Sequence, residues 1–522
     1  MRYAIVGQMS ASRTAPAQRR SGFVLVAVLL VVVVLALSAY RFTQSMAAEY
    51  RVADGLERTA QARAFARSAI DYSMVMLSNP QNFSSVLMNN PFDNSAVFQH
   101  IIVQANDKPH FQGAFDIVAP LGVDATAGGQ VGNTLGVFDE HSKININALF
   151  ALDSSGTTLT NFLMALPNMT EDVANSIVDW IDPDDTTRDN GAESDYYSGL
   201  SPPYVAKNGP LDSIEELLMV KGVTPQLLFG NDQNRNGVLD PGEDDGTGVL
   251  DQGWSAYLTV FSRERNVSSQ NVPRINVNSS DLTTLLTQLA AVVGEPMACY
   301  IVGARLYSPT PIAAGATKPA TGGQLTQQQL GNLASPTTQP SSISSLFTLV
   351  NTTISIPGSN GQAATTYACP LNDASTLQST LPLMLDQLTT QGTSDIPARL
   401  NVNTAPLALL EALPGITAAQ AQTIFDQRPV YTGGAAPDPS FATTAWLLNQ
   451  GNLTPTIMQG LDRYVTASSQ VYRIQSIGYF DGGGPMARME AVIDTNAGQP
   501  RLMYLRDLTE LGKGFTPNTN QP

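Results

Sequence analysis

The stretch Arg19–Ala27, which reads RRSGFVLVA, decides how the rest of the chain is organised. A basic leader ends at a small residue, and an uncharged apolar run then continues to Tyr40. At a rise of about 1.5 Å per residue, a helix over this run is just long enough to cross a thin bilayer. The leader has no acidic residue, which predicts that it stays in the cytoplasm while everything after Arg41 crosses the membrane. Its arginines are Arg2, Arg13, Arg19 and Arg20.

Three fates of this segment are open. One is a secretory signal peptide cut near the small residues 36–39, and a second is a membrane anchor that is not cut. The third is a cut between Gly22 and Phe23. Here the stretch resembles type IV pilin-like signals, in which a basic leader ends in glycine and a hydrophobic residue becomes the new N-terminus. Most such proteins have Glu as the fifth mature residue, where this chain has Ala27. In lacking that Glu the chain resembles one family, the minor pseudopilin K of the type II secretion system (general secretion pathway protein K).

The composition limits the class of protein. The 522 residues leave room for three or four domains, and a hydrophobic content of 43% allows a folded core. The formal net charge of −16 predicts repulsion from nucleic-acid phosphates, whereas carboxylates suit divalent cations. Cys299 and Cys369 both follow the membrane segment, so one disulfide in an oxidising compartment and two buried thiols are both open.

The helical pattern continues beyond the membrane segment. Apolar residues recur at steps of three and four, which predicts one long helix from about Val24 to Leu77, about 80 Å at the standard rise. Asn79 and Pro80 should end it. A helix that is half apolar and half amphipathic is typical of pilin-like subunits in a helical bundle; an anchor followed by a surface helix is the alternative. The stripe consists of Val52, Leu56, Ala60, Ala64, Ala66, Ile70 and Met74.

A six-residue pattern occurs three times in the chain: basic, apolar, Asn, apolar, Asn, small. It reads KININA at 143–148, RINVNS at 274–279 and RLNVNT at 399–404. Each copy precedes a helix-forming apolar run. We expect a short strand with inward apolar side chains, after which the second Asn or the next residue caps a helix. The three copies therefore predict the starts of three similar units.

Two of these units contain a helical hairpin. The turns are residues 167–170 and 414–417, and the second hairpin resembles a helix-hairpin-helix unit. Such units often bind DNA through a Gly-apolar-Gly turn, but Thr417 stands in place of the second glycine. No Lys or Arg lies between Leu400 and Gln427. We therefore interpret the hairpins as packing modules and expect no nucleic-acid partner.

The remaining segments complete the expected fold class. Short strands are predicted at 111–118 and 135–139. Residues 308–345 are rich in Pro, Thr, Gly, Gln and Ser, which predicts an inserted loop or linker. β-rich runs at 471–477, 488–494 and 502–506, with a glycine-rich hairpin loop at 482–485, predict a C-terminal antiparallel sheet. The order of elements indicates an α+β fold: a pilin-like long N-terminal helix and an antiparallel sheet, with a large, mainly helical (helix-hairpin-helix/SAM-like) insertion.

The expected domain organisation follows from these boundaries. It consists of a prepilin-type leader (1–22), a transmembrane and amphipathic pilin helix (23–78), the first part of the pilin-like head (79–142), an inserted α-domain with a calcium loop (143–306), a low-complexity linker (307–345), a second helical hairpin unit (346–467), the C-terminal sheet of the head (468–510) and a disordered tail (511–522).

The clearest chemical motif is a twelve-residue loop, DQNRNGVLDPGE, at 232–243. Its spacing fits an EF-hand-type calcium loop, because Ca²⁺ needs six to eight oxygen ligands and the loop wraps to deliver them. Gly237 allows the sharp bend, and the alternative is an acidic solvated loop. The candidate ligands are Asp232, Asn234, Asn236, the carbonyl of Val238, Asp240 and Glu243.

A second group of acidic residues lies between positions 179 and 197. Carboxylates this dense repel one another unless a cation or hydrogen bonds offset the repulsion. The run Asp179-Trp180-x-Asp182, followed by Gly191-Ala-Glu193 and a tyrosine pair, is similar to a signature of pseudopilin K proteins. Because that family binds calcium in its α-domain, the resemblance implies calcium ligands among Asp182, Asp184, Asp185, Glu193 and Asp195. Helix-cap and turn chemistry is the alternative.

Little in the sequence suggests catalysis. The three histidines lack metal-ligand spacing, and no His-Glu-x-x-His, Gly-x-Ser-x-Gly or Walker A motif occurs. We therefore do not expect an enzyme.

The resemblance implies a minor pseudopilin at the tip of the type II secretion pseudopilus, acting in protein secretion across the outer membrane, with a calcium-stabilised periplasmic domain. It implies a single-pass inner-membrane protein whose partners are prepilin peptidase and, through the N-terminal helix, other minor pseudopilins. Two alternatives stay open: a minor pilin of a type IV or DNA-uptake pilus, and a signal-peptide-processed calcium-binding envelope scaffold protein.

Overall fold

The computed structural model describes residues 21–127, 132–312, 322–334, 336, 338–358, 362–496, 499–512 and 514–515. The chain forms two compact units, residues 1–61 and 62–522. Most of the expected leader, part of the expected linker and most of the expected tail lie outside the described residues. Each unit is therefore described by itself.

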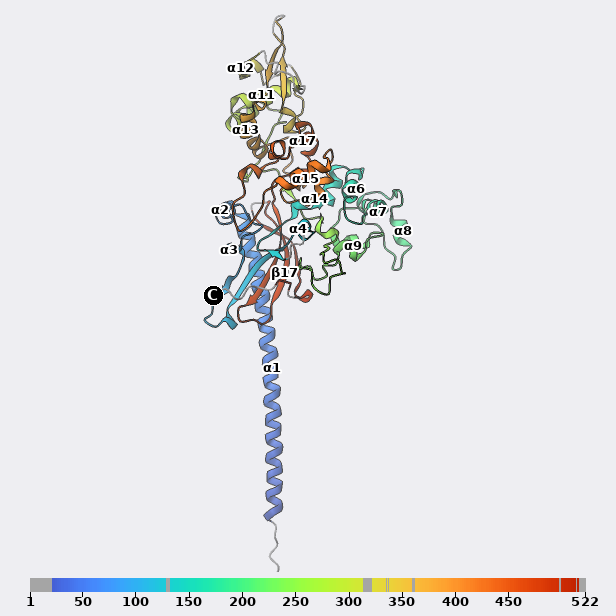
Figure 1. The fold of residues 1–522 in the computed structure, drawn as a ribbon, viewed down its shortest axis with the longest axis vertical. Helices are drawn as coiled ribbons and strands as arrows, with labels where there is room; N and C mark the ends of the chain where they lie inside the picture. Colours follow the sequence, from blue (N-terminus) through green and yellow to red (C-terminus); the bar gives the residue numbers. More distant parts are fainter. Residues whose placement is uncertain are drawn as a thin grey trace, which may run out of the picture. The chain divides into compact units, whose positions relative to one another are not determined.

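One helix, α1 (Ser21–Ser78), begins in the first unit and ends in the second, and Figure 1 shows it unbroken. In the first unit its apolar side chains from Phe23 to Leu37 are exposed. By length and composition this is the one helix, within the described residues, that could cross a membrane. It confirms the predicted long helix. Asn79 then accepts hydrogen bonds from the next main-chain N–H groups and caps α2 (Pro80–Ser85), so α1 stops where Pro80 was expected to end it.

The second unit contains a seven-stranded sheet with the central order β1-β2-β16-β17-β18. All pairings are antiparallel, and β2 pairs with β16 so that Val118 lies opposite Gln475. The predicted C-terminal strands thus complete a sheet begun near residue 101, which confirms the α+β class. The strands are β1 (Ile101–Gln104), β2 (Gly113–Pro120), β3 (Asn133–Thr134), β4 (Phe138–Asp139), β16 (Val471–Phe480), β17 (Ala487–Asp494) and β18 (Arg501–Asp507).

The C-terminal part of α1 covers one face of this sheet. Ala69 and Ile70 are fully buried in a cluster with Phe115, Ile474 and other strand residues. The helix and β16 approach closely at Gly478, where a Cβ atom would lie 2.1 Å from the carbonyl oxygen of Ala62. A glycine is therefore required at this contact. This face carries the apolar packing expected of a pilin-like head.

The buried positions of the opposite face include charged residues. Gln475, Arg488 and Glu490 are buried there on β16 and β17, and Arg473 beside them is partly buried. Arg473 lies 3.3 Å from Glu490 on the neighbouring strand and also pairs with Glu140, which belongs to the inserted residues between β4 and β16. The insertion is thus attached to the sheet through polar contacts.

Each of the three repeated motifs begins a unit that closes on itself. The motif strand pairs in parallel with a two-residue strand near the end of the same unit. The pairs are β5 (Ile144–Asn145) with β6 (Leu258–Thr259), β8 (Ile275–Asn276) with β12 (Leu388–Thr389), and β14 (Leu400–Asn401) with β15 (Val465–Thr466).

The predicted helix caps are wrong in these units. The first Asn of the motif, Asn145, caps α5 by accepting a hydrogen bond from the N–H of Ala148. In the second unit Asp281 caps α10, and in the third α14 begins after Pro406. In the first unit the helix begins before the second Asn, and in the other two units it begins several residues after it. The second Asn is therefore not at a position where it could cap the helix.

The second Asn instead holds distant main chain. Asn147 accepts a hydrogen bond from the N–H of Leu211 and donates one to its carbonyl. Asn278 does the same to Ile343. Asn403 donates to two carbonyls and accepts from the indole of Trp446. These amides fasten segments that are remote in sequence to the three motif strands.

The insertion is mainly helical and encloses the largest buried core among the described residues. Its helices are α5 (Ile146–Leu152), α6 (Thr157–Leu163), α7 (Glu171–Ile181), α8 (Ser194–Ser198), α9 (Pro225–Phe229), α10 (Leu282–Val293), α11 (Glu295–Tyr307), α12 (Gln327–Leu330), α13 (Ala374–Gln387), α14 (Leu407–Glu411), α15 (Ala418–Gln427), α16 (Trp446–Asn449) and α17 (Pro455–Leu461); α3 (Ser95–Phe98) and α4 (Val123–Ala127) precede it. The further strands are β7 (Glu264–Arg265), β9 (Thr310–Pro311), β10 (Thr352–Ile356), β11 (Thr365–Ala368) and β13 (Asp395–Ile396).

The segment expected to be a linker is partly packed. Leu330 at the end of α12, with Leu325 before the helix and Leu333 after it, is buried in the core of the insertion. Cys299 and Cys369 are buried free thiols in the same core.

Candidate metal centres

The Asp232 loop (residues 232–243) follows α9 and is held in a tight turn by its own side chains. The two carboxylate oxygens of Asp232 accept hydrogen bonds of 3.0 Å from the N–H groups of Asn236 and Gly237. Gly237 has a φ of +70°, a conformation that favours glycine. Val238 donates its N–H to the side-chain oxygen of Asn236. The main chain therefore wraps around Asp232 as the motif predicted.

The two ends of the Asp232 loop are joined through Glu243. Its carboxylate accepts hydrogen bonds of 3.2 Å from the N–H groups of Asn234 and Asp240. The side-chain amides of Asn234 and Asn236 donate to the same oxygen of Asp240, at 2.6 and 3.0 Å. All six proposed ligand residues thus belong to one hydrogen-bonded turn, and its oxygen-rich chemistry suits Ca²⁺.

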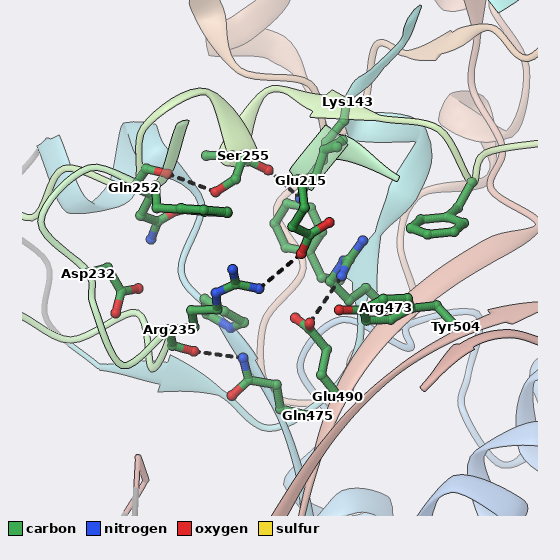
Figure 2. Close-up of a pocket in the computed structure, with 16 residues that line it drawn as sticks. Lys143, Glu215, Asp232, Arg235, Gln252, Ser255, Arg473, Gln475, Glu490 and Tyr504 are labelled. Carbon is green, nitrogen blue, oxygen red and sulfur yellow. Dashed lines mark hydrogen bonds and ion pairs between the residues drawn. The ribbon is translucent and has the colours of Figure 1, made fainter. Parts of the chain in front are cut away.

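The Asp232 loop rests on the polar face of the sheet. Gln475 donates a hydrogen bond of 2.8 Å to the carbonyl oxygen of Arg235, as Figure 2 shows. Arg488 donates to the carbonyl oxygen of Asn234, and its Nε and Nη1 atoms have no hydrogen-bond partner among the described residues. The loop is therefore joined to β16 and β17 through its main chain.

A cavity of about 100 Å³ lies beside this junction (Figure 2). Its charged lining is balanced, because Arg235 pairs with Glu215 and Arg473 pairs with Glu490. Burial lowers the pKa of Lys143 to about 8, and its ammonium group donates to the carbonyl oxygen of Ser255. The cavity is thus lined by residues of both the insertion and the sheet, and forms part of the joint between them.

The acidic cluster (Asp179, Asp182 and Glu193) lies where α7 ends and α8 begins. One ligand atom from each residue lies within 4.8 Å of the others, the one such group of three among the described residues. Asp179 is fully buried and Glu193 is 3% exposed. Burial, followed by repulsion from Asp179 and Asp182, raises the pKa of Glu193 to about 7. The cluster is thus short of positive charge.

The hydrogen bonds of the acidic cluster are incomplete. Arg188 donates to Asp179 at 2.9 Å and also to Asp182. Within the described part of the chain, both carboxylate oxygens of Glu193 and one of Asp182 are buried without a hydrogen-bond partner. Buried carboxylate oxygens without partners are costly, and a divalent cation would satisfy them. The residues therefore fit a calcium ion.

The other acidic residues named from the sequence lie outside the cluster. Asp184, Asp185 and Asp195 are exposed. Asp184 accepts the N–H of Thr186 at 2.8 Å, and Asp185 accepts from the hydroxyl of Ser194 at 3.1 Å. Asp179 is the cluster member that was absent from the candidate ligands. Its spacing of three residues from Asp182, across the C-terminal end of α7, was the available signal.

The main chain around the cluster is built for close approach. A Cβ atom on Gly191 would lie 2.0 Å from Oδ2 of Asp179, and that oxygen accepts the N–H of Ala192 at 2.9 Å. Lys221 donates 3.0 Å hydrogen bonds to the carbonyls of Asn190 and Gly191. The turn that carries Glu193 is thereby fixed against α7.

The proposed cleavage site lies at the start of α1. Gly22 belongs to this helix and Phe23 is 83% exposed, whereas the arginines of the leader lie outside the described residues. An exposed apolar helix start is compatible with membrane insertion.

Taken together, a long N-terminal helix that packs on an antiparallel sheet, with a helical insertion between the strands, is the architecture expected of a pilin-like protein. Two segments of the chain, residues 142–229 and 400–458, match family models described as type II secretion system (T2SS), protein K. The resemblance to the protein K pseudopilins is confirmed over these two segments. The matched segments begin at the first and third repeated motifs.

Among solved structures, the chain is similar to one in the crystal structure of the GspK–GspI–GspJ complex from the enterotoxigenic Escherichia coli type 2 secretion system. The identity is 13%, the TM-score is 0.37, and the match covers 88% of this chain and 98% of the other. No curated protein matches the chain.

Proposed function

We propose that this chain is a minor pseudopilin at the tip of the type II secretion pseudopilus, with a structural role in assembly rather than an enzymatic one. The carrying observation is a single helix that runs from an apolar N-terminal half into the core of a pilin-like head, with the protein K segments inserted in that head. Such a helix enters a helical bundle, and such an insertion enlarges the head.

The tip position follows from Ala27 and from the insertion. In a stack of pilin helices, a carboxylate at the fifth mature residue can neutralise a neighbour's N-terminal ammonium inside hydrocarbon, where an unpaired charge is costly. Ala27 has no carboxylate. A subunit at the end of the filament does not need one of these pairings, and its large head does not collide with copies above it.

The partners that fit are other minor pseudopilins, bound through α1. Beyond the apolar run the helix exposes Phe42, Tyr50, Val52 and Leu56, all more than 60% exposed. Exposed large apolar side chains along one helix mark a surface that another helix covers.

Processing by prepilin peptidase between Gly22 and Phe23, followed by residence in the inner membrane with a periplasmic C-terminal part, belongs to the same proposal. Mass spectrometry of the mature N-terminus tests it. We expect the protein to begin at Phe23, with a methylated amine. A start at Ala39 or Tyr40 would identify a conventional signal peptide and overturn the proposal.

We further propose that calcium stabilises the insertion at the Asp232 loop, with Asp232, Asn234, Asn236, Val238, Asp240 and Glu243 as ligands, and at the acidic cluster, with Asp179, Asp182 and Glu193. Calcium in 100-fold excess over its Kd would raise the free energy of unfolding by about 2.7 kcal/mol per site. Urea unfolding with calcium and with chelator measures this gain. Glu243→Gln should abolish the calcium-dependent gain from the Asp232 loop, and Glu193→Gln should abolish the gain from the acidic cluster. Identical unfolding curves with and without calcium would contradict the proposal.

A further inference from the structure

We infer that Arg188 is a tethered cation that competes with calcium for the acidic cluster, so that calcium binds by displacing its guanidinium group. This rests on the proposed calcium site and assigns its regulation to a residue of the chain itself. In the calcium-free chain Arg188 holds the carboxylates together, and in the calcium-bound chain it releases them.

The contacts of Arg188 show that it occupies the cluster as a counter-ion. Its Nη1 atom donates to Oδ1 of Asp179 at 2.9 Å and to Oδ2 of Asp182, so one nitrogen bridges two of the three carboxylates. Its Nη2 atom donates to the carbonyl oxygen of Ser155 at 3.2 Å. Glu193, the third carboxylate, receives no hydrogen bond from the described residues. The arginine thus satisfies part of the cluster and leaves the rest unpaired.

The number of free oxygens argues for exchange. With Arg188 in place, the oxygens without a partner in the described chain are the two of Glu193 and Oδ1 of Asp182. Calcium takes six to eight oxygen ligands, so with only three carboxylate oxygens it would depend on water for at least half of them and bind weakly. Release of the guanidinium frees Oδ1 of Asp179 and Oδ2 of Asp182, which brings the carboxylate oxygens to five. Calcium gains these two ligands only if Arg188 gives them up.

The geometry allows Arg188 to leave. Its side chain is 25% exposed, whereas those of Asp179 and Asp182 are 0% and 5% exposed. Its main-chain N–H also points at Asp179, at 3.2 Å from Oδ2, and that contact does not depend on the guanidinium. The side chain can therefore turn toward solvent while the loop that carries it stays attached to the cluster.

The exchange favours divalent cations. A monovalent ion brings the same charge as the guanidinium and none of its directed hydrogen bonds, so it gains nothing by replacing Arg188. A calcium ion brings twice the charge to three carboxylates. Only an ion that binds the carboxylates more strongly than the guanidinium does can replace Arg188. Calcium meets this condition, and sodium and potassium do not.

Calorimetric titration of the detergent-solubilised full-length protein with calcium chloride tests the inference. A parent carrying Glu243→Gln confines binding to the acidic cluster. Arg188→Gln should tighten calcium binding about tenfold, because the competing ion pairs are gone. Arg188→Lys keeps the charge without the bridging geometry, so its calcium affinity should lie between those of the parent and of Arg188→Gln.

Lys207→Gln is the matched control. Lys207 lies in the same part of the insertion and pairs with Asp212 and Glu216 at 2.8 Å, outside the cluster. Its removal takes away the same charge but should leave the calcium affinity within about twofold. Equal tightening by Lys207→Gln and Arg188→Gln would show a general charge effect and overturn the inference.

Two further outcomes separate this inference from the calcium proposal. If the parent binds calcium and Arg188→Gln binds it equally or more weakly, Arg188 is not a competitor, but the site stands. If neither binds calcium, both fail together. Urea unfolding supplies a second readout. Arg188→Gln should lower the unfolding midpoint in chelator and recover it in calcium, whereas a merely structural role would lower it in both.

Discussion

Gln475 on β16 donates a 2.8 Å hydrogen bond to the carbonyl oxygen of Arg235, in the middle of the Asp232 loop. The two residues are far apart in sequence, and one belongs to the pilin-like sheet and the other to the insertion. Arg488 repeats the arrangement one loop position earlier, at Asn234. The turn proposed to bind calcium is therefore also the turn that attaches the insertion to the sheet.

Gln475→Ala tests this attachment. Loss of a buried hydrogen bond should lower the free energy of unfolding by about 1 kcal/mol and loosen the loop. Hydrogen exchange should show faster amide exchange within residues 232–243. Gln459→Ala, which removes a 3.4 Å contact to the carbonyl of Phe347 elsewhere in the insertion, is the control. Unchanged loop exchange in Gln475→Ala would contradict the attachment.

Gly191→Ala should disrupt the acidic cluster. The new Cβ atom would lie 2.0 Å from Oδ2 of Asp179, so either the turn or the carboxylate must shift. We expect a loss of about 2 kcal/mol in the free energy of unfolding. Gly199→Ala, whose Cβ would meet its nearest atom at 3.4 Å, should be tolerated. Equal stability of the two variants in urea unfolding would disprove the steric argument.

The raised pKa of Glu193 predicts a pH dependence in the absence of calcium. Its pKa rises from the usual 4.5 to about 7 on folding, so between these values the folded chain holds a proton that the unfolded chain has lost. The contribution of Glu193 to stability should therefore fall as pH rises from 4.5 toward 7 and stay low above it. Unfolding in chelator at several pH values measures this.

Glu193→Gln should remove that part of the pH dependence, since it cannot titrate. Glu411→Gln, at an exposed carboxylate, should leave the profile as in the original chain. Parallel profiles for Glu193→Gln and the unaltered chain would show that Glu193 titrates normally.

Asn403→Ala should destabilise the third unit. The Asn403 side chain donates to the carbonyls of Phe441 and Ala467 and accepts from the indole of Trp446, so its removal leaves one buried and two partly buried polar groups without this partner. We expect a loss of about 2–4 kcal/mol. Asn449→Ala, at an exposed position on α16, should change stability by less than about 0.5 kcal/mol. Similar thermal midpoints for Asn403→Ala and Asn449→Ala would contradict this stabilising role of Asn403.

Ala27→Glu tests the tip position. The residue is exposed on α1, so folding of the head should be unaffected, while assembly order and recovery of tip complexes should change. Ala27→Gln, which has nearly the same shape as Glu without the charge, is the control. Copurification of minor pseudopilins and a secretion assay measure the effect. Normal complexes and secretion with Ala27→Glu would count against the tip position.

The elements with strong local patterns were predictable. The long helix and the sheet strands follow from apolar periodicity, which is a property of neighbouring residues. The closing strand pairs were not predictable, because a strand of two residues exists only where a distant partner lies beside it. For the same reason, the hydrogen bonds of the Asn278 side chain could not be predicted from the residues next to it in sequence, since its partner Ile343 belongs to a later segment.

Of the two candidate sites, one could be predicted from local sequence and the other could not. The Asp232 loop is a local motif whose spacing shows its chemistry. The acidic cluster depends on a turn that returns Glu193 to Asp179, while Asp184 and Asp185 turn outward to bind Thr186 and Ser194. The number of acidic residues in this stretch could not show which carboxylates face the cluster and which face solvent.

The pairing of β2 with β16 has a consequence for the order of biogenesis. The core strand at residues 113–120 has no neighbour on its inner edge until residues 471–480 have been synthesised. Until then α1 has only an unfinished surface to pack against, and pairings this remote in sequence form slowly. A truncated or stalled chain would keep that helix surface uncovered. Completion of the sheet thus acts as a length check: only a chain translated nearly to its end can present a finished head to a growing filament.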